Sequence, residues 1–145
     1  MKITCGIYLF NNRNELLICH PTNHKWTLWI LPKGRIDEGE TDYFDVAKRE
    51  LYEETNINLD DFKYEITNIT PFEIVRYRSS NKYLKSFLVK TSHNFDSHDI
   101  KCDSMVVWDG KPVFPEVDSF KWVTIEEASK LLHESQVPNL DLCRK

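Results

Sequence analysis

Three glutamates and one arginine stand close together in the sequence RELYEE at residues 49–54. On an α-helix, residues three and four positions apart share a face, so Glu50 would lie beside both Glu53 and Glu54. Arg49, four positions before Glu53, would lie next to the same cluster. Crowded carboxylates repel one another, and a hard divalent cation such as Mg²⁺, which prefers oxygen ligands, would relieve that repulsion. The spacing therefore indicates a metal site on one helix face.

The residues before this helix supply a loop suited to such a site. Gly34, in the sequence Pro-Lys-Gly, lets the backbone come close to a ligand, and Gly39 with Glu40 adds a second bend and a fourth carboxylate. A Glu-x-x-Glu-Glu pattern alone is more typical of a solvated surface helix with one Glu–Arg pair. The glycine-containing loop directly before the helix favours the metal site instead.

Residues 34–57 resemble the signature of the Nudix hydrolases, which is Gly, five residues, Glu, seven residues, and then Arg-Glu-aliphatic-any-Glu-Glu-any-Gly-aliphatic. Gly34 and Glu40 have the signature's spacing, and the second half from Arg49 to Ile57 matches it without a gap. The order of expected elements outside these residues also resembles the family's. The resemblance therefore covers essentially the whole chain.

The chain departs from the signature in two places. Eight residues, not seven, separate Glu40 from Arg49, so the extra residue falls within residues 41–48 and lengthens the loop or first turn before the helix. Asn56 stands where the signature has glycine. That position closes the helix in the left-handed conformation, which Asn tolerates better than most residues. The first departure puts the position of Glu40 relative to the metal in question, whereas the second is expected to be harmless.

The resemblance implies one Nudix domain over residues 1–145, with an α/β/α sandwich in which a mixed β-sheet lies between helices. It also implies Mg²⁺ or Mn²⁺ as cofactor and hydrolysis of the pyrophosphate linkage in a nucleoside diphosphate that is joined to another moiety. The implied metal ligands are Glu50, Glu53, Glu54 and the backbone carbonyl of Gly34. Arg49 is implied to orient a glutamate, with Glu53 as the expected one.

The catalytic base has several candidates, because different members of the family use different glutamates. Glu50 and Glu53 lie within the signature, and Glu116 lies just before the expected strand that carries Trp122. For Glu116, an ordinary loop carboxylate is an equally good interpretation.

Substrate-binding candidates are Lys33 in the signature loop and four cations around the expected turn at residues 79–81. These cations would grip phosphates, or else form a basic edge that discourages strand pairing. Aromatic residues nearby would stack on a base, although strand aromatics are more often core. The cations and aromatic residues are Arg76, Arg78, Lys82, Lys85, Tyr77, Tyr83, Trp26 and Trp29. His20 and His24 are predicted at the surface.

Hydrophobic alternation predicts strands at residues 2–10, 15–20, 26–31, 64–70, 72–78, 83–90 and 120–123. The glutamate-bearing helix is expected to begin at Thr41 or Asp42. Thr124 and Glu127 form a capping box that opens a second helix through Leu132, and a helical turn is expected at residues 136–142. Residues 91–115 show no regular pattern apart from 105–108. This order predicts an α/β fold.

Composition limits the partners. A net charge of −4 gives no sign of a broad nucleic-acid surface, so an RNA contact would be limited to a 5′ end. No apolar run approaches a membrane span, and no signal-peptide pattern is present. The four scattered cysteines indicate reduced thiols. We therefore expect a cytoplasmic monomer or homodimer without a membrane partner.

A small-molecule nucleotide is the expected substrate, and the diadenosine tetraphosphate hydrolase branch is the most similar part of the family. That makes a dinucleoside polyphosphate the first hypothesis. The alternatives are a dNTP, ADP-ribose, the 5′ end of RNA and a diphosphoinositol polyphosphate. A different class remains open as well, namely a catalytically silent Nudix module that only binds a nucleotide.

Overall fold

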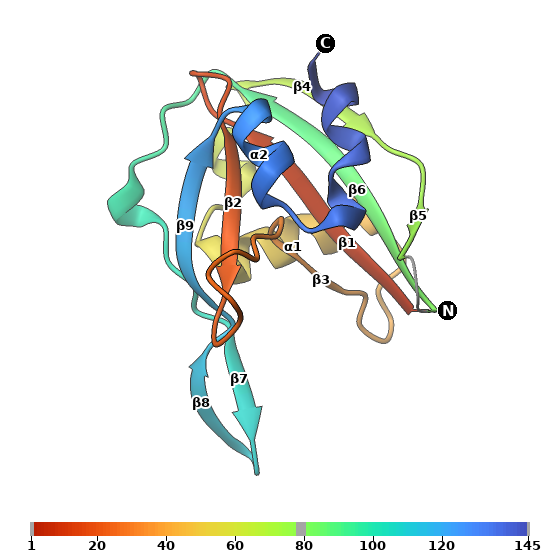
Figure 1. Ribbon diagram of the computed structural model, residues 1–145, viewed down its shortest axis with the longest axis vertical. Coiled ribbons are helices and arrows are strands. Elements are labelled where there is room, and N and C mark those ends of the chain that lie inside the picture. The colour runs from red at the N-terminus through yellow and green to blue at the C-terminus, as the bar shows by residue number, and fades with distance from the viewer. Residues whose placement is uncertain (1, 78–80, 145) are drawn as a thin grey trace.

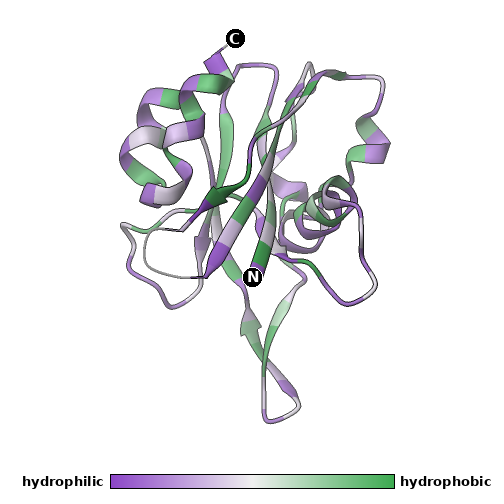
Figure 2. Ribbon diagram, turned by 90° about the vertical axis from the view of Figure 1, so that its right-hand side faces the viewer, coloured by the Kyte–Doolittle hydropathy of each residue, from purple (hydrophilic) through white to green (hydrophobic). Residues whose placement is uncertain are grey.

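The computed structural model describes residues 2–77 and 81–144. Within these residues a seven-stranded sheet separates two helical layers (Figure 1). Helix α1 (Tyr43–Thr55) covers one face, and α2 (Ile125–Leu131) with the 3₁₀ helix η4 (Pro138–Arg144) covers the other. Figure 2 shows the two helical layers on opposite sides of the sheet. The predicted α/β/α sandwich with a mixed sheet is confirmed.

The sheet has the order β4-β6-β1-β2-β9, and β3 and β5 pair with β1 and β6 beside this path. Strands β1 and β6 run parallel, and the other pairs are antiparallel. Seven strands make up the sheet: β1 (Lys2–Phe10), β2 (Leu16–Pro21), β3 (Lys33–Arg35), β4 (Ile66–Pro71), β5 (Val75–Arg76), β6 (Lys82–Thr91) and β9 (Val117–Val123).

Strand β1 changes its neighbour along its length. Near its end Phe10 pairs with Leu16 of β2, whereas near its start Cys5 pairs with Gly34 of β3. The predicted strand over 26–31 is wrong, because this segment makes only isolated bridges, such as that between Cys19 and Ile30. The segment carries the chain from β2 across to the other half of β1. This crossing delivers Gly34 to the centre of the sheet.

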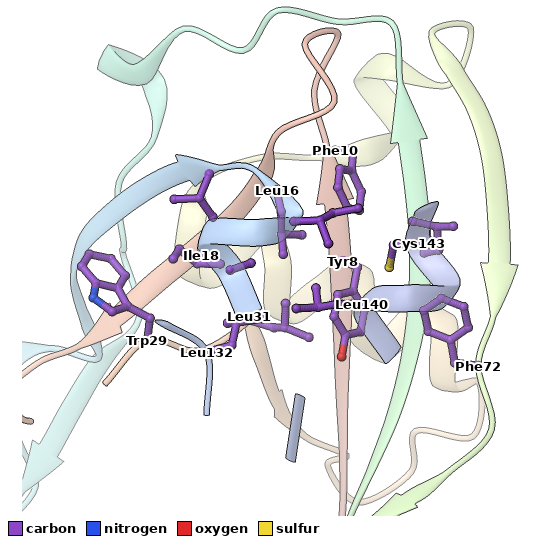
Figure 3. Packing of buried hydrophobic residues seen from close by; sticks show 14 residues of the cluster. Tyr8, Phe10, Leu16, Ile18, Trp29, Leu31, Phe72, Leu132, Leu140 and Cys143 are labelled. Carbon is purple, nitrogen blue, oxygen red and sulfur yellow. The ribbon is translucent and has the colours of Figure 1, made fainter. Parts of the chain in front are cut away.

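Two hydrophobic cores lie on the two faces of the sheet, because side chains alternate along each strand. Tyr8 and Phe10 of β1 point into the core beneath α2 and η4, which Figure 3 shows from close by. Cys5, Ile7 and Leu9 point into the core beneath α1. Both faces of β1 are buried, as the sequence predicts for a central strand.

The helix ends are set by local side chains. Asp42 caps α1 by accepting a hydrogen bond from the backbone N–H of Asp45, which confirms one of the two predicted starts. Asn56 closes α1 with φ 66° and ψ 11°, the left-handed conformation expected at this position. The predicted capping box of α2 is also confirmed, since Thr124 and Glu127 bond to each other's backbone N–H groups.

Several predicted boundaries are wrong. The strand expected at 72–78 is reduced to Val75–Arg76, and Pro71 lies at the end of β4 rather than between two strands. The region 91–115 contains a hairpin formed by β7 (Met105–Trp108) and β8 (Lys111–Pro115), of which only the first strand is expected from the sequence. Its second strand contains two prolines, which weaken the sequence signal for a strand.

The remaining helices are short 3₁₀ turns: η1 (Leu59–Phe62), η2 (Ser97–Asp99) and η3 (Glu134–Gln136). The predicted turn at 136–142 corresponds to η3 and η4. All four cysteines are free thiols. Among the described residues, no helix is long and apolar enough to cross a membrane.

The left-handed end of α1 gives a stability prediction. Asn56→Ala should lower the free energy of unfolding by about 1 kcal/mol, because alanine is strained in this conformation. Asn56→Gly should stay within about 0.5 kcal/mol of the parent protein, since glycine adopts it without strain. Urea denaturation measures both variants. Equal losses would assign the effect to the side-chain hydrogen bond from Asn56 Nδ2 to the Asp99 carbonyl instead.

Candidate active site

Helix α1 brings three glutamates to the edge of strand β3. Glu50 and Glu54 are buried, and Glu53 stands at the rim with its side chain 38% exposed. Gly34 makes this approach possible, because a Cβ atom added there would overlap the carboxyl group of Glu50. A glycine is therefore required in β3 for Glu50 to reach its place.

The guanidinium of Arg49 joins this cluster to the preceding loop. Its Nε and Nη2 each donate to one oxygen of Glu40 at 2.8 Å. Its Nη1 donates to Glu50 Oε1 at 2.9 Å and to Glu53 Oε1 at 3.0 Å. Three carboxylates thus accept hydrogen bonds from one cation, and this arrangement keeps them close together despite their mutual repulsion. The longer spacer after Glu40 does not move Glu40 away from the cluster.

Glu54 is held from the other side by the signature loop. The backbone N–H of Lys33 donates to Glu54 Oε1 at 3.1 Å. Burial raises the pKa of Glu54 well above its usual value, and this hydrogen bond opposes the rise. Burial lowers the pKa of the Lys33 side chain, and the charge of Glu54 opposes that change. Lys33 and Glu54 therefore lie as opposite charges that are both largely removed from water.

Glu116 comes from a distant part of the chain, between β8 and β9. Its backbone is fixed by bonds from its N–H to the Ser104 carbonyl and from the Thr22 N–H to its own carbonyl. The fold brings it near enough to Glu50 and Glu54 for the negative charge of its carboxylate to contribute to their raised pKa values. Among the described residues, this carboxylate accepts no hydrogen bond.

The electrostatics of the cluster favour a bound cation. Burial, followed by the charge of Glu53, raises the pKa of Glu50 to about 7, although Arg49 opposes the rise. Oε2 of Glu50 and Oε2 of Glu54 accept no hydrogen bond within the described residues. A divalent ion would compensate the charge of these two oxygens, and Mg²⁺ is commonly held by one or two carboxylates with water and substrate oxygens.

The carboxylates are not arranged as a complete set of metal ligands. In the part of the chain that the structure describes, no three His, Cys, Asp or Glu side chains converge on one metal position. The reason is visible in the contacts of Arg49, which draws Glu53 Oε1 and Glu50 Oε1 towards itself. Water, substrate or the Gly34 carbonyl would have to complete the coordination.

Most of the predicted basic residues lie away from the cluster. Lys85 is two strands from Gly34, roughly 10 Å across the sheet, and its Nζ donates to the Phe72 carbonyl at 2.6 Å. Arg76 and Lys82 lie on β5 and β6, farther from α1, and Tyr83 packs against the α1-side core. Arg78 lies outside the described residues.

Sequence reasoning missed the surroundings of Tyr77. Its ring centroid is 6.2 Å from that of the exposed His133, at an interplanar angle of 46°. Burial raises the pKa of Tyr77, and the side chain of Gln136, which also accepts the Leu31 N–H, opposes the rise. The sequence predicted a helical turn at 136–142, which includes Gln136. It did not predict that this turn would lie beside Tyr77 and Leu31.

The surface prediction for His20 is wrong, whereas that for His24 is confirmed. His20 is buried, with Nδ1 2.7 Å from Asp118 Oδ1 and Nε2 3.0 Å from the Lys25 carbonyl. For Trp26 the sequence favoured a core aromatic over a base-stacking residue; its side chain is instead exposed and stacks on this imidazole with ring centroids 4.3 Å apart. Trp29 is buried, as expected for a core aromatic. The partner Asp118 is 98 positions away, so no local pattern could reveal this contact.

Comparisons with known proteins identify the family of the chain. The sequence pattern of the NUDIX domain matches residues 2–142. The chain is 30% identical over 142 residues to an RNA pyrophosphohydrolase of Bartonella clarridgeiae, covering 88% of this chain and 78% of that protein. In structure it resembles a C. elegans Ap4A hydrolase in a binary complex, with a TM-score of 0.66, 22% identity, and coverage of 97% of this chain and 93% of that one.

A second structural likeness is to the NUDIX domain of Shewanella oneidensis NrtR complexed with ADP ribose. The TM-score is 0.69 at 18% identity, and the match covers 98% of this chain and 85% of that one. At such identities the two structural likenesses show the fold alone.

The NUDIX match over residues 2–142 and the relative named RNA pyrophosphohydrolase identify the class of protein as a hydrolase of phosphoric anhydrides. The chain belongs to the Nudix family, and it is a pyrophosphohydrolase of that family. Nudix enzymes generally use divalent metal ions, and the free oxygens of Glu50 and Glu54 fit that requirement.

The raised pKa of Glu50 predicts how the stability of the metal-free protein changes with pH. Its pKa is about 7 in the folded protein and 4.5 for an unperturbed glutamate, so the folded state binds the proton more tightly. The free energy of unfolding should therefore fall as pH rises through this window, and the loss should be complete above about 7. Glu54 acts in the same direction.

Urea denaturation with a chelator present, below and above this window, measures the effect. Glu50→Gln should show a shallower dependence on pH, because the amide does not titrate. A parent protein and a Glu50→Gln variant with equal pH dependence would contradict the assignment to Glu50.

Proposed function

We propose that the chain is a Mg²⁺- or Mn²⁺-dependent pyrophosphohydrolase that acts on the 5′ phosphates of a nucleotide. The observation that carries this proposal is the pair of buried carboxylates, Glu50 and Glu54, packed against Gly34 with one oxygen of each left free. Burying two acidic side chains in this way is costly unless a cation compensates their charge. Family membership and the identity of these residues support the same function.

The proposed ligands are Glu50 and Glu54 with their free oxygens, Glu53 at the rim and the carbonyl of Gly34. A bound divalent ion screens the negative phosphate oxygens and makes a water molecule more acidic. Arg49 keeps the ligands in place, because it holds Glu50 and Glu53 through one nitrogen and the loop residue Glu40 through two others.

Glu116 is the proposed general base. Its exposed carboxylate has no hydrogen-bond partner among the described residues and is free to accept a proton from the attacking water. Glu50, the other candidate, is bound to Arg49 and packed against Gly34, which suits a ligand better than a base. As the water oxygen bonds to phosphorus, the bridging P–O bond breaks and its electron pair leaves with the departing phosphate.

The 5′ end of RNA is the first candidate substrate. Curated relatives at 30% and 32% identity carry the name RNA pyrophosphohydrolase. A net charge of −4 is compatible with recognition of an RNA end rather than a long duplex. A dinucleoside polyphosphate is the second candidate, which the likeness to the Ap4A hydrolase structure brings forward. A cytoplasmic location, where either substrate would be met, is part of the proposal.

The predicted substrate-binding residues remain proposals. Lys33 has the best position, because it lies beside Glu54 and Glu116 where phosphates would enter. Tyr77, with His133 beside it, is a candidate platform for a base. Lys85 would have to give up its bond to the Phe72 carbonyl in order to reach a phosphate.

Two conservative substitutions separate the base from the metal ligands. Glu116→Gln should lower kcat about 100-fold or more while leaving Mn²⁺ affinity unchanged, because the amide cannot accept the proton. Glu53→Gln should abolish turnover and also weaken Mn²⁺ binding, with folding intact. Steady-state kinetics and calorimetric Mn²⁺ titration measure the two effects, and Glu73→Gln, at an exposed loop position, is the control. Full activity in Glu116→Gln would remove it as the base.

A substrate panel tests the activity itself. With Mg²⁺ present, we expect cleavage of a 5′-triphosphorylated short RNA faster than that of diadenosine tetraphosphate, ADP-ribose, the dNTPs or a diphosphoinositol polyphosphate. Anion-exchange chromatography separates the products. Faster cleavage of diadenosine tetraphosphate than of the RNA would make a dinucleoside polyphosphate the first candidate substrate and the RNA 5′ end the second. Nucleotide binding without cleavage of any member would support the silent binding module.

A further inference from the structure

The hairpin formed by β7 and β8, called here the arm (residues 105–115), projects away from the sandwich (Figure 1). Its strands pair with each other and, within the described residues, with no strand of the main sheet. The base of the arm is fixed, because the N–H groups of Asp103 and Ser104 donate to the Glu53 carbonyl. The arm therefore starts from a defined position at the end of α1.

The arm has a specific turn. Asp109 and Gly110 connect the strands with φ values of 52° and 76°, which is typical of the tight two-residue turns that join twisted strands. Trp108 pairs with Lys111 directly beside the turn. The sequence thus specifies a regular hairpin that packs against almost none of the rest of its own chain.

The surface of the arm is unusually apolar. Met105, Val107, Trp108 and Val113 are 39%, 62%, 76% and 49% exposed. Figure 2 shows hydrophobic colour along much of both strands. Isolated two-stranded hairpins are only marginally stable in water, and contiguous exposed apolar residues commonly mark an interaction surface. Both properties indicate that the arm is stabilised by something that covers it.

The two edges of the arm differ in their ability to pair with another strand. Strand β8 contains Pro112 and Pro115, which have no backbone N–H, and a register shift interrupts the pairing opposite Val106 and Val107. Strand β7 contains no proline and, among the described residues, its outer edge has no strand beside it. Because proline blocks edge pairing, the free edge that accepts a strand is that of β7.

We propose that the arm is a self-association surface, on which the β7 edges of two copies of this chain pair antiparallel about a two-fold axis. Such a contact is self-complementary, because the β7 edge of one copy pairs with the β7 edge of the other. The two arms together then form one four-stranded sheet. The projection of the arm keeps the two sandwiches apart in that arrangement.

The charges of the arm fit a second copy better than a nucleic acid. Lys101, Asp103 and Glu116 flank its base, and its tip carries Asp109 and Lys111. Antiparallel pairing places the base of one arm beside the tip of the other, so that each end meets both signs of charge. An RNA strand would require a basic surface, and these residues have no net positive charge.

The expected association is weak, because one short arm covers less than the roughly 800 Å² per partner of a standard interface. Sedimentation measurements from about 1 µM to about 1 mM protein should show a reversible shift from 17.2 kDa towards twice that mass. Val107→Lys should weaken the association at least tenfold, because a lysine on an edge strand opposes pairing. Its thermal unfolding should match that of the parent protein, which shows that the fold is intact.

Tyr64→Lys is the matched control, because Tyr64 is 92% exposed and lies outside the arm. It should leave the association unchanged. A monomer across the whole concentration range would overturn the proposal, and so would a dimer that Val107→Lys leaves unaffected. A monomer in which Val107→Lys weakens binding of a 5′-triphosphorylated RNA would also overturn it and would assign the arm to the substrate.

The geometry of the contact has its own test. In a Cys102→Ser background, Val107→Cys should form a disulfide-linked dimer with glutathione disulfide, which accepts the two electrons and two protons of the thiol pair. Tyr64→Cys in the same background should remain a monomer. Equal cross-linking at both positions would contradict pairing through β7.

Discussion

The site depends on the hydrogen bonds that the guanidinium of Arg49 donates to the surrounding glutamates. The guanidinium binds Glu40 with two nitrogens and reaches Glu50 and Glu53 with a third, so one cation connects the loop to the helix. Three carboxylates gathered without such a partner would repel one another or turn outwards to water. With Arg49 in place, each carboxylate keeps a fixed hydrogen-bond partner, and Oε2 of Glu50 accepts no hydrogen bond within the described residues.

The sheet provides the other half of this arrangement. Strand β1 pairs with β2 at one end and with β3 at the other, and the second pairing places Gly34 of β3 beside Cys5 beneath α1. Because Gly34 has no side chain, Glu50 packs directly against β3. The glutamate face of α1 therefore rests on β3, which is paired with the central strand β1, and core packing on both faces of β1 keeps this support rigid.

The chain between α1 and β9 contains both the proposed base and the arm. Its last residue before β9, Glu116, carries the proposed base, and the arm extends from the same segment. Ser104, at the base of the arm, bonds to both Glu53 and Glu116 through its backbone. Pairing of two arms would thus hold the segment that positions the base, which gives self-association a direct structural path to the active site.

The sequence by itself determined several features that depend on short spacings. The glutamate face of α1, a cap at Thr41 or Asp42, the left-handed end at Asn56 and the capping box at Thr124 follow from residues at most four positions apart. The alternation along β1 likewise revealed a strand buried on both faces.

Only the tertiary structure decided what depends on distant residues. The segment 26–31 has strand-forming residues, but it crosses from β2 to the other half of β1 and makes only isolated bridges. His20 is buried because Asp118 and the Trp26 ring cover it, and β8 forms despite its prolines because β7 pairs with it. The proximity of Glu116 to Glu50 and Glu54 has the same origin, since chain crossings rather than local propensity bring these carboxylates together.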